Sequence, residues 1–191
     1  MHATKLFNTL EGGLIATPNA ADREKIYYLR NFGIKNEDQV LEIGINGKMN
    51  EVQAAIGLLN LTAVAGEKSK RRALRKRYCD ILADLPGVQT QPVDCDVENS
   101  EQYFPLIIDE TIYGRNRDEL YDALKVRNVF SRKYFHPICT DFAPYQHMEI
   151  VTTRDAPHAE IVKKRVLCLP FHSNVNEDAL EVMADVFHNA R

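Results

Sequence analysis

The stretch Gly44-Ile45-Asn46-Gly47-Lys48-Met49-Asn50-Glu51-Val52-Gln53-Ala54-Ala55 passes from a glycine-containing loop into a helix. Asn50 stands where a helix N-cap is expected. Three apolar residues then recur at helical spacing: Val52, Ile56 and Leu59. Three small residues permit close helix packing: Ala54, Ala55 and Gly57. The stretch therefore predicts the start of a major helix.

The helical pattern continues to about Leu82. Leu74, Tyr78 and Ile81 form a stripe at i, i+4 and i+7, and Leu85-Pro86-Gly87 closes the pattern. We expect either one long helix or two helices joined near Gly66.

The residues before this helix predict a strand, a helix and a loop. Leu14–Thr17 is a short apolar run ended by Pro18, which favours a strand. A helix opening at Asn19 or Ala20 runs to about Leu29, and Gly33 fits the stop signal beyond it. Residues 34–48 lack helical periodicity, which predicts an irregular loop.

Strands and helices alternate in the remainder of the chain. The expected strands are Val88–Gln91, Tyr103–Ile108, Val129–Tyr134 and Val166–Leu169. The expected helices are Arg117–Val126, Ala159–Lys164 and Glu177–Asn189. This order indicates an α/β fold in which helices pack on a small sheet.

Composition excludes several classes of protein. The 191 residues are 45% hydrophobic and 27% charged, which is typical of a globular chain and argues against disorder. A net charge of −3 argues against a nucleic-acid binder. No apolar run is long enough to span a membrane, and the first residues lack a signal-peptide pattern. The four cysteines lack metal-ligand spacing, so we expect free buried thiols, no metal and a cytoplasmic location.

The densest charge cluster lies between Lys68 and Arg77. Interleaved Ala73, Leu74 and Tyr78 favour the solvated side of an amphipathic helix, with phosphate or anion contact as the alternative. Asp94 and Asp96 are interpreted as solvated loop residues. The chain contains no GxGxxG, Walker or GxSxG motif.

Two segments carry a more specific pattern. The first is His2-Ala3-Thr4-Lys5 followed by Glu11-Gly12-Gly13, and the second is the Gly44–Ala55 stretch. In this order they resemble the DegT/DnrJ/EryC1/StrS sugar aminotransferases, which use pyridoxal phosphate. Three later segments also resemble that family: Tyr103-Phe104-Pro105, Arg132-Lys133-Tyr134-Phe135-His136-Pro137 and Cys168-Leu169-Pro170. The resemblance covers essentially the whole chain and implies the C-terminal part of a fold-type I transferase.

The resemblance assigns roles to four residues. Lys5 matches the lysine that forms a Schiff base with the cofactor and then acts as a base. Asn46 matches a residue that reaches across a homodimer interface to the partner's cofactor phosphate. Lys48, which we expect to bind substrate near that site, stands where the family often has Arg, and a lysine supplies charge without a bidentate fork. His136 lies in the stretch that approaches the sugar substrate in relatives.

The chain also departs from the family pattern. Met1 stands at the position of a Phe, and the Ser that binds the cofactor phosphate in relatives does not precede it. In the family the residues before the lysine supply most of the cofactor pocket. We therefore expect residues 1–48 to be a remnant of the large cofactor-binding domain, with its lysine strand, helix and interface loop. Residues 49–191 would form the small α/β domain.

The expected function is that of the C-terminal part of an aminotransferase. It would transfer an amino group, from glutamate, to a nucleotide-linked keto-sugar, and the isolated chain would be inactive without a complementary N-terminal polypeptide. One alternative is a non-catalytic binding or dimerisation module. The other is a sugar dehydratase relative, against which Lys5 argues because dehydratases of the family carry His there.

Overall fold

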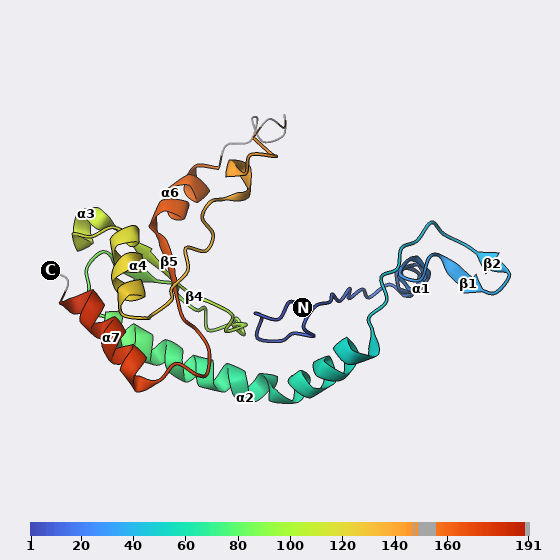
Figure 1. The fold of residues 1–191 in the computed structure, drawn as a ribbon, viewed down its shortest axis with the longest axis horizontal. Coiled ribbons are helices and arrows are strands. Elements are labelled where there is room, and N and C mark those ends of the chain that lie inside the picture. Colours follow the sequence, from blue (N-terminus) through green and yellow to red (C-terminus); the bar gives the residue numbers. More distant parts are fainter. Residues whose placement is uncertain (147, 149–155, 190–191) are drawn as a thin grey trace. The chain divides into compact units, whose positions relative to one another are not determined.

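The computed structural model describes residues 1–146, 148 and 156–189, and it forms two compact units, Met1–Ala65 and Gly66–Arg191 (Figure 1). The division falls inside a helix. The expected domain boundary between residues 48 and 49 stays a prediction. That residues 1–48 derive from a cofactor-binding domain stays a prediction. None of the helices in the described part of the chain is long and apolar enough to cross a membrane.

The first unit opens with a loop and helix α1, Ala20–Leu29. The Asn19 side chain accepts a hydrogen bond from the Ala21 amide at 2.9 Å and caps the helix, as the sequence predicts. The expected strand at Leu14–Thr17 is wrong, as is a strand at Lys5. A strand requires a ladder of backbone hydrogen bonds to a neighbour, and among the described residues no β-ladder or β-bridge includes either segment.

The expected irregular loop at 34–48 contains a small hairpin. Strand β1, Ile34–Asn36, pairs antiparallel with β2, Gln39–Val40 (Figure 1). The Asn36 side chain accepts a hydrogen bond from the Asp38 amide at 3.1 Å, which closes the turn between the strands.

Helix α2, Glu51–Leu82, is one continuous helix of 32 residues (Figure 1). Asn50 caps it reciprocally with Gln53: the Asn50 side chain accepts from the Gln53 amide at 2.8 Å, and the Gln53 side chain accepts from the Asn50 amide at 3.3 Å. Gly66 lies within the helix without breaking it, so the alternative of two joined helices is wrong.

The second unit is built on a three-stranded antiparallel sheet of order β3-β4-β5. These strands are Val88–Thr90, Phe104–Ile108 and Val166–Leu169, with Val88 opposite Ile108 and Phe104 opposite Leu169. The strand expected at Val129–Tyr134 is wrong: only Arg132 bridges to Cys168, through bonds of 2.7 and 2.9 Å.

Besides the end of α2, the described part of the second unit contains further helical elements. They are α3 (Glu110–Tyr113), α4 (Arg117–Val126), the 3-10 turn η1 (Cys139–Asp141), α6 (Pro157–Arg165) and α7 (Glu177–His188). The core contains fully buried residues from helices and strands alike: Leu106, Leu120, Leu124, Leu167 and Phe187. The α/β class with a long helix and a small sheet is therefore confirmed.

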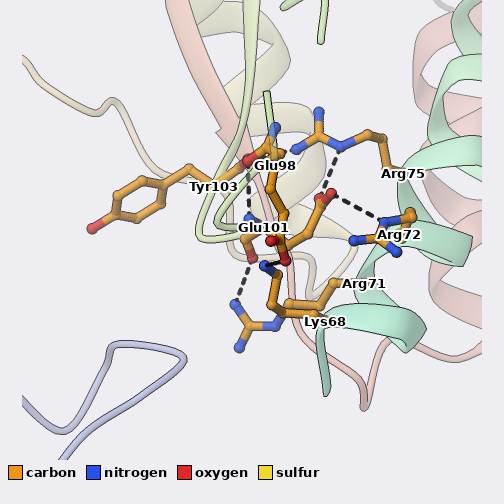
Figure 2. Close-up of polar contacts among 8 residues, drawn as sticks. Lys68, Arg71, Arg72, Arg75, Glu98, Glu101 and Tyr103 are labelled. Atoms are coloured by element: carbon orange, nitrogen blue, oxygen red, sulfur yellow. Dashed lines mark hydrogen bonds and ion pairs between the residues drawn. The ribbon is translucent and has the colours of Figure 1, made fainter. Parts of the chain in front are cut away.

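The basic run of α2 departs from its solvated interpretation. Arg72 and Lys70 are exposed, but Arg71 is buried and Arg75 is half-buried against the segment that precedes β4 (Figure 2). Burial is possible because Glu101 meets both guanidinium groups: its carboxylate accepts from Arg75 Nε, and its backbone carbonyl accepts from Arg71 Nη1.

The cysteines are all free, but their burial differs from the expectation. Cys168 is buried and Cys79 is half-buried, whereas Cys95 and Cys139 are exposed. Ligand-type atoms of Asp94, Cys95 and Asp96 lie within 4.8 Å of one another, all on exposed side chains.

Candidate functional site

The loop that carries Lys5 is folded by its own backbone. The Lys5 amide donates to the His2 carbonyl at 3.0 Å, and the Lys5 carbonyl accepts from the Asn8 side chain at 3.1 Å. The Thr9 amide donates to the Met1 carbonyl at 3.1 Å. These bonds form a compact turn in which Lys5 is half-buried.

Two contacts anchor this loop to the first half of α2. Thr9 is only 2% exposed, and its methyl group lies so near Gly57 that a Cβ there would be 2.8 Å from it. The side chain of Asn60, one turn further along the helix, donates to the Asn8 carbonyl at 3.0 Å. The glycine of the small-residue stretch thus admits the lysine loop, where the sequence suggested another helix.

The two sequence motifs meet at Gly12. A Cβ at this residue would lie 2.6 Å from Thr9 Oγ1 and 3.0 Å from Met49 Cε, and its φ of +142° is one that glycine adopts most readily. The Glu-Gly-Gly turn of the first motif therefore packs on the methionine of the second. The sequence motif points to Gly12 but not to the role of Thr9, because an isolated threonine in a loop carries no distinguishing signal.

The segment with Asn46 and Lys48 runs beside the C-terminal end of α1. The amides of Ile45 and Gly47 each donate at 2.8 Å, to the carbonyls of Leu29 and Arg30. These bonds satisfy carbonyls that the end of a helix leaves without partners. The segment is therefore held by backbone bonds, and its side chains remain available.

Asn46 and Lys48 both reach solvent. Asn46 is exposed, and its backbone bridges to Asn31. Lys48 is exposed, and its Nζ lies 4.4 Å from the centre of the Phe32 ring, a cation–π contact. The ring steadies the ammonium group without neutralising it.

A cavity of about 1090 Å³ in the first unit is lined by residues of both motif segments and of α1. Its lining includes Leu14 and Ile15 after the lysine loop, Ile45 and Met49 around the second motif, and Tyr27 of α1. Lys5, Asn46 and Lys48 are not among the residues that line it. The structure therefore brings the two motif segments together around an apolar cavity.

His136 belongs to the second unit. It is exposed, and its amide donates to the Lys133 carbonyl at 2.6 Å. Nearby Asp141 accepts from Lys163 Nζ at 2.9 Å through both carboxylate oxygens. The Lys163 bonds hold the pKa of Asp141 below its usual value, with a further contribution from the charge of His136.

Comparison with known proteins identifies the relatives of this chain. Residues 1–187 match the model of the DegT/DnrJ/EryC1/StrS aminotransferase family. The chain belongs to this family. The resemblance inferred from the sequence motifs is therefore confirmed.

Two relatives in the DegT/DnrJ/EryC1/StrS family are transaminases of a nucleotide-linked sugar. The dTDP-4-amino-4,6-dideoxy-D-glucose transaminase of Escherichia coli is 38% identical over 168 residues, 88% of this chain and 45% of that protein. Its counterpart in Shigella dysenteriae is 36% identical and covers 100% of this chain and 51% of that protein.

Among solved structures, DesI in the presence of its TDP-sugar product matches with a TM-score of 0.87 and 36% identity. The match covers 97% of this chain and 46% of DesI. The chain thus spans about half the length of the DegT/DnrJ/EryC1/StrS proteins that it matches.

Proposed function

We propose that this chain is the C-terminal half of an aminotransferase that uses pyridoxal phosphate to aminate a nucleotide-linked keto-sugar, with glutamate as donor. The carrying observation is the packing of the lysine loop, through Thr9 and Gly12, on the second family motif and its helix. Membership of the family supports the proposal. Both named relatives are transaminases, so the comparisons do not favour the alternatives of a binding module or a dehydratase.

The residues of the first unit fit the two ends of pyridoxal phosphate. Lys5 offers a primary amine for the aldehyde, and the Asn46 amide and the Lys48 ammonium can bind phosphate. None of the three is a carboxylate, so none of them supplies the acidic partner that the ring nitrogen needs. The bound cofactor supplies an electron sink for the carbanion formed at the reacting carbon.

Lys5 then performs the proton transfers. Its amine takes the α-proton from the amino donor and later returns a proton to the sugar carbon that receives the amino group. Anchoring of its loop to α2 limits the positions that the amine can occupy, which is what a proton transfer requires. His136 would contact the sugar of the substrate.

We also propose that the protein acts as a homodimer in the cytoplasm. Large apolar side chains flank the Asn46 segment and lie open: Ile43 is 99% exposed and Ile45 is 72% exposed. Exposed apolar patches of this kind are typical of interfaces, and such an interface would let Asn46 reach the partner's cofactor. The free cysteines suit a reducing compartment.

The cofactor assignment is tested by covalent labelling. The chain is incubated with pyridoxal phosphate, reduced with borohydride and digested, and the modified lysines are located by mass spectrometry. We expect Lys5 to carry the label preferentially. Lys5→Arg should remove it, whereas Lys35→Arg, on the exposed hairpin, should not.

Equal labelling of exposed lysines in both variants would contradict the role of Lys5. Transamination itself is tested by co-expressing the chain with the first half of the Escherichia coli relative. Transfer of ¹⁵N from glutamate to a dTDP-linked keto-sugar would support the proposed reaction, and water loss from the sugar would favour the dehydratase.

A further inference from the structure

Three aromatic side chains, Tyr103, Tyr134 and Phe135, form a cluster next to His136. The rings of Tyr134 and Phe135 are stacked with their centres 4.7 Å apart, and the Tyr103 ring meets both edge-on at 5.5 and 6.2 Å. Phe135 is 64% exposed, so burial in a hydrophobic core does not hold its ring in place. The edge-on contact with Tyr103 is the interaction that orders the pair.

Tyr103 is in turn fixed by Arg75 of α2. Arg75 Nη2 donates to the Tyr103 carbonyl at 3.3 Å, and Nε donates to the Glu101 carboxylate at 2.9 Å. Figure 2 shows the Tyr103 ring pointing away from the guanidinium groups. Arg75 therefore holds the backbone of this residue and leaves its ring for the aromatic cluster.

Glu101 is held more firmly than a surface acid would be. Its side chain is 3% exposed, its carbonyl accepts from Arg71 Nη1 at 3.1 Å, and its amide donates to the Asn99 side chain at 2.9 Å. Its φ of +52° lies in the left-handed region, which non-glycine residues seldom occupy. A buried carboxylate in a costly backbone conformation persists only where its partners over-determine it.

The segment that the rings belong to is fixed at its other end by β5. Arg132 makes the two backbone bonds to Cys168, and Cys168 Sγ donates to the Tyr134 carbonyl at 3.9 Å. The backbone is thus tied at Arg132 and Tyr134. Beyond Tyr134, the His136 amide donates to the Lys133 carbonyl at 2.6 Å, and the exposed Phe135 ring contacts the Tyr103 ring.

We propose that Arg75 and Glu101 are positioning residues that act through Tyr103 to set the place of Phe135 and His136, where the nucleotide-sugar is to be recognised. The substrate part of this inference rests on the proposed function, but the positioning does not. It predicts that the ion pair between Arg75 of α2 and Glu101 before β4 influences an exposed loop through the ring of Tyr103.

The experiment follows the loop by NMR in the full chain, with labelled Phe and His and no cofactor. Ring currents from Tyr103 and Tyr134 shift the Phe135 signals away from random-coil values. We expect Glu101→Gln and Tyr103→Leu to abolish most of this shift and to move the His136 ring signals. Tyr103→Phe keeps the ring and should restore both.

Arg77→Gln is the matched control. Arg77 also lies on α2 and binds a carboxylate, donating to Glu177 at 2.7 and 2.8 Å, but it does not touch the aromatic cluster. Its loss should leave the Phe135 and His136 signals unchanged. If Glu101→Gln does not fold, Arg75→Lys takes its place and should cause the same loss, because it keeps the positive charge but removes the Nη2 donor to the Tyr103 carbonyl.

Unchanged Phe135 and His136 signals in folded Glu101→Gln or in Tyr103→Leu would overturn the proposal. So would equal shifts in Arg77→Gln. Because this measurement uses neither pyridoxal phosphate nor substrate, its failure is distinct from a failure of Lys5 labelling.

Discussion

Two glycines in α2 provide a direct test of the anchoring of the lysine loop. Glycine inside a helix costs about 1 kcal/mol relative to alanine, so Gly→Ala should stabilise the chain where there is space. At Gly66 a new Cβ meets no atom within 4 Å. At Gly57 it would lie 2.8 Å from the Thr9 methyl group, closer than carbon atoms pack.

The magnitudes predict opposite signs for the two variants. Gly66→Ala should gain about 1 kcal/mol of stability. Gly57→Ala gains the same helix preference but adds an overpacking cost of about 1–3 kcal/mol, since Thr9 is β-branched and buried. Thr9 also cannot turn away freely, because its hydroxyl donates to the Glu11 carbonyl at 2.5 Å. The net effect at Gly57 is a loss of up to about 2 kcal/mol.

The assay is urea unfolding followed by helical circular dichroism, with hydrogen exchange of residues 1–13 as the local measurement. A difference of 1 kcal/mol moves the midpoint by about 0.3–1 M urea. Faster exchange in the loop and weaker Lys5 labelling should accompany the loss in Gly57→Ala. The reasoning is refuted if Gly57→Ala stabilises the chain as much as Gly66→Ala does.

Two further predictions concern buried groups of the second unit. Tyr78→Phe should cost about 1–3 kcal/mol in urea unfolding, because the phenol donates to the Pro170 carbonyl at 2.6 Å and leaves that acceptor unpaired. Burial raises the pKa of the Cys168 thiol from its ordinary 9.0 to about 11, so maleimide followed by mass spectrometry at pH 8 should label Cys95 and Cys139 well before Cys168. The raised pKa of Cys168 stabilises the folded state below pH 9, and this stabilisation is lost as the pH rises towards 11. Equal labelling of the three cysteines, or no loss of stability between pH 9 and 11, would argue against the raised pKa.

The elements that were predicted correctly are those whose signals are local. Helix α4, Arg117–Val126, has the expected bounds, because Asn116 and Glu119 cap it reciprocally within three residues. Strand β5, Val166–Leu169, is a short apolar run that is buried along its whole length.

The elements that were predicted wrongly depend on distant partners. Val129–Tyr134 has the apolar composition of a strand, yet only Arg132 finds a neighbour. The hairpin after Gly33 was overlooked because its strands are too short to show an alternating pattern.

The candidate site shows the same division. The sequence by itself determined the family, the lysine at position 5 and the residue types offered to a cofactor, because motif order and spacing are properties of the chain. The packing of Thr9 of the lysine loop on Gly57, and of Arg71 and Arg75 on Glu101, is visible in the folded structure alone. Both contacts join atoms far apart in sequence: a methyl group meets a glycine, and two guanidinium groups meet the carbonyl and the carboxylate of one glutamate. No local pattern encodes such pairs. The methyl contact gains free energy only when both partners leave water together, and the charged groups offset their desolvation cost only when they meet.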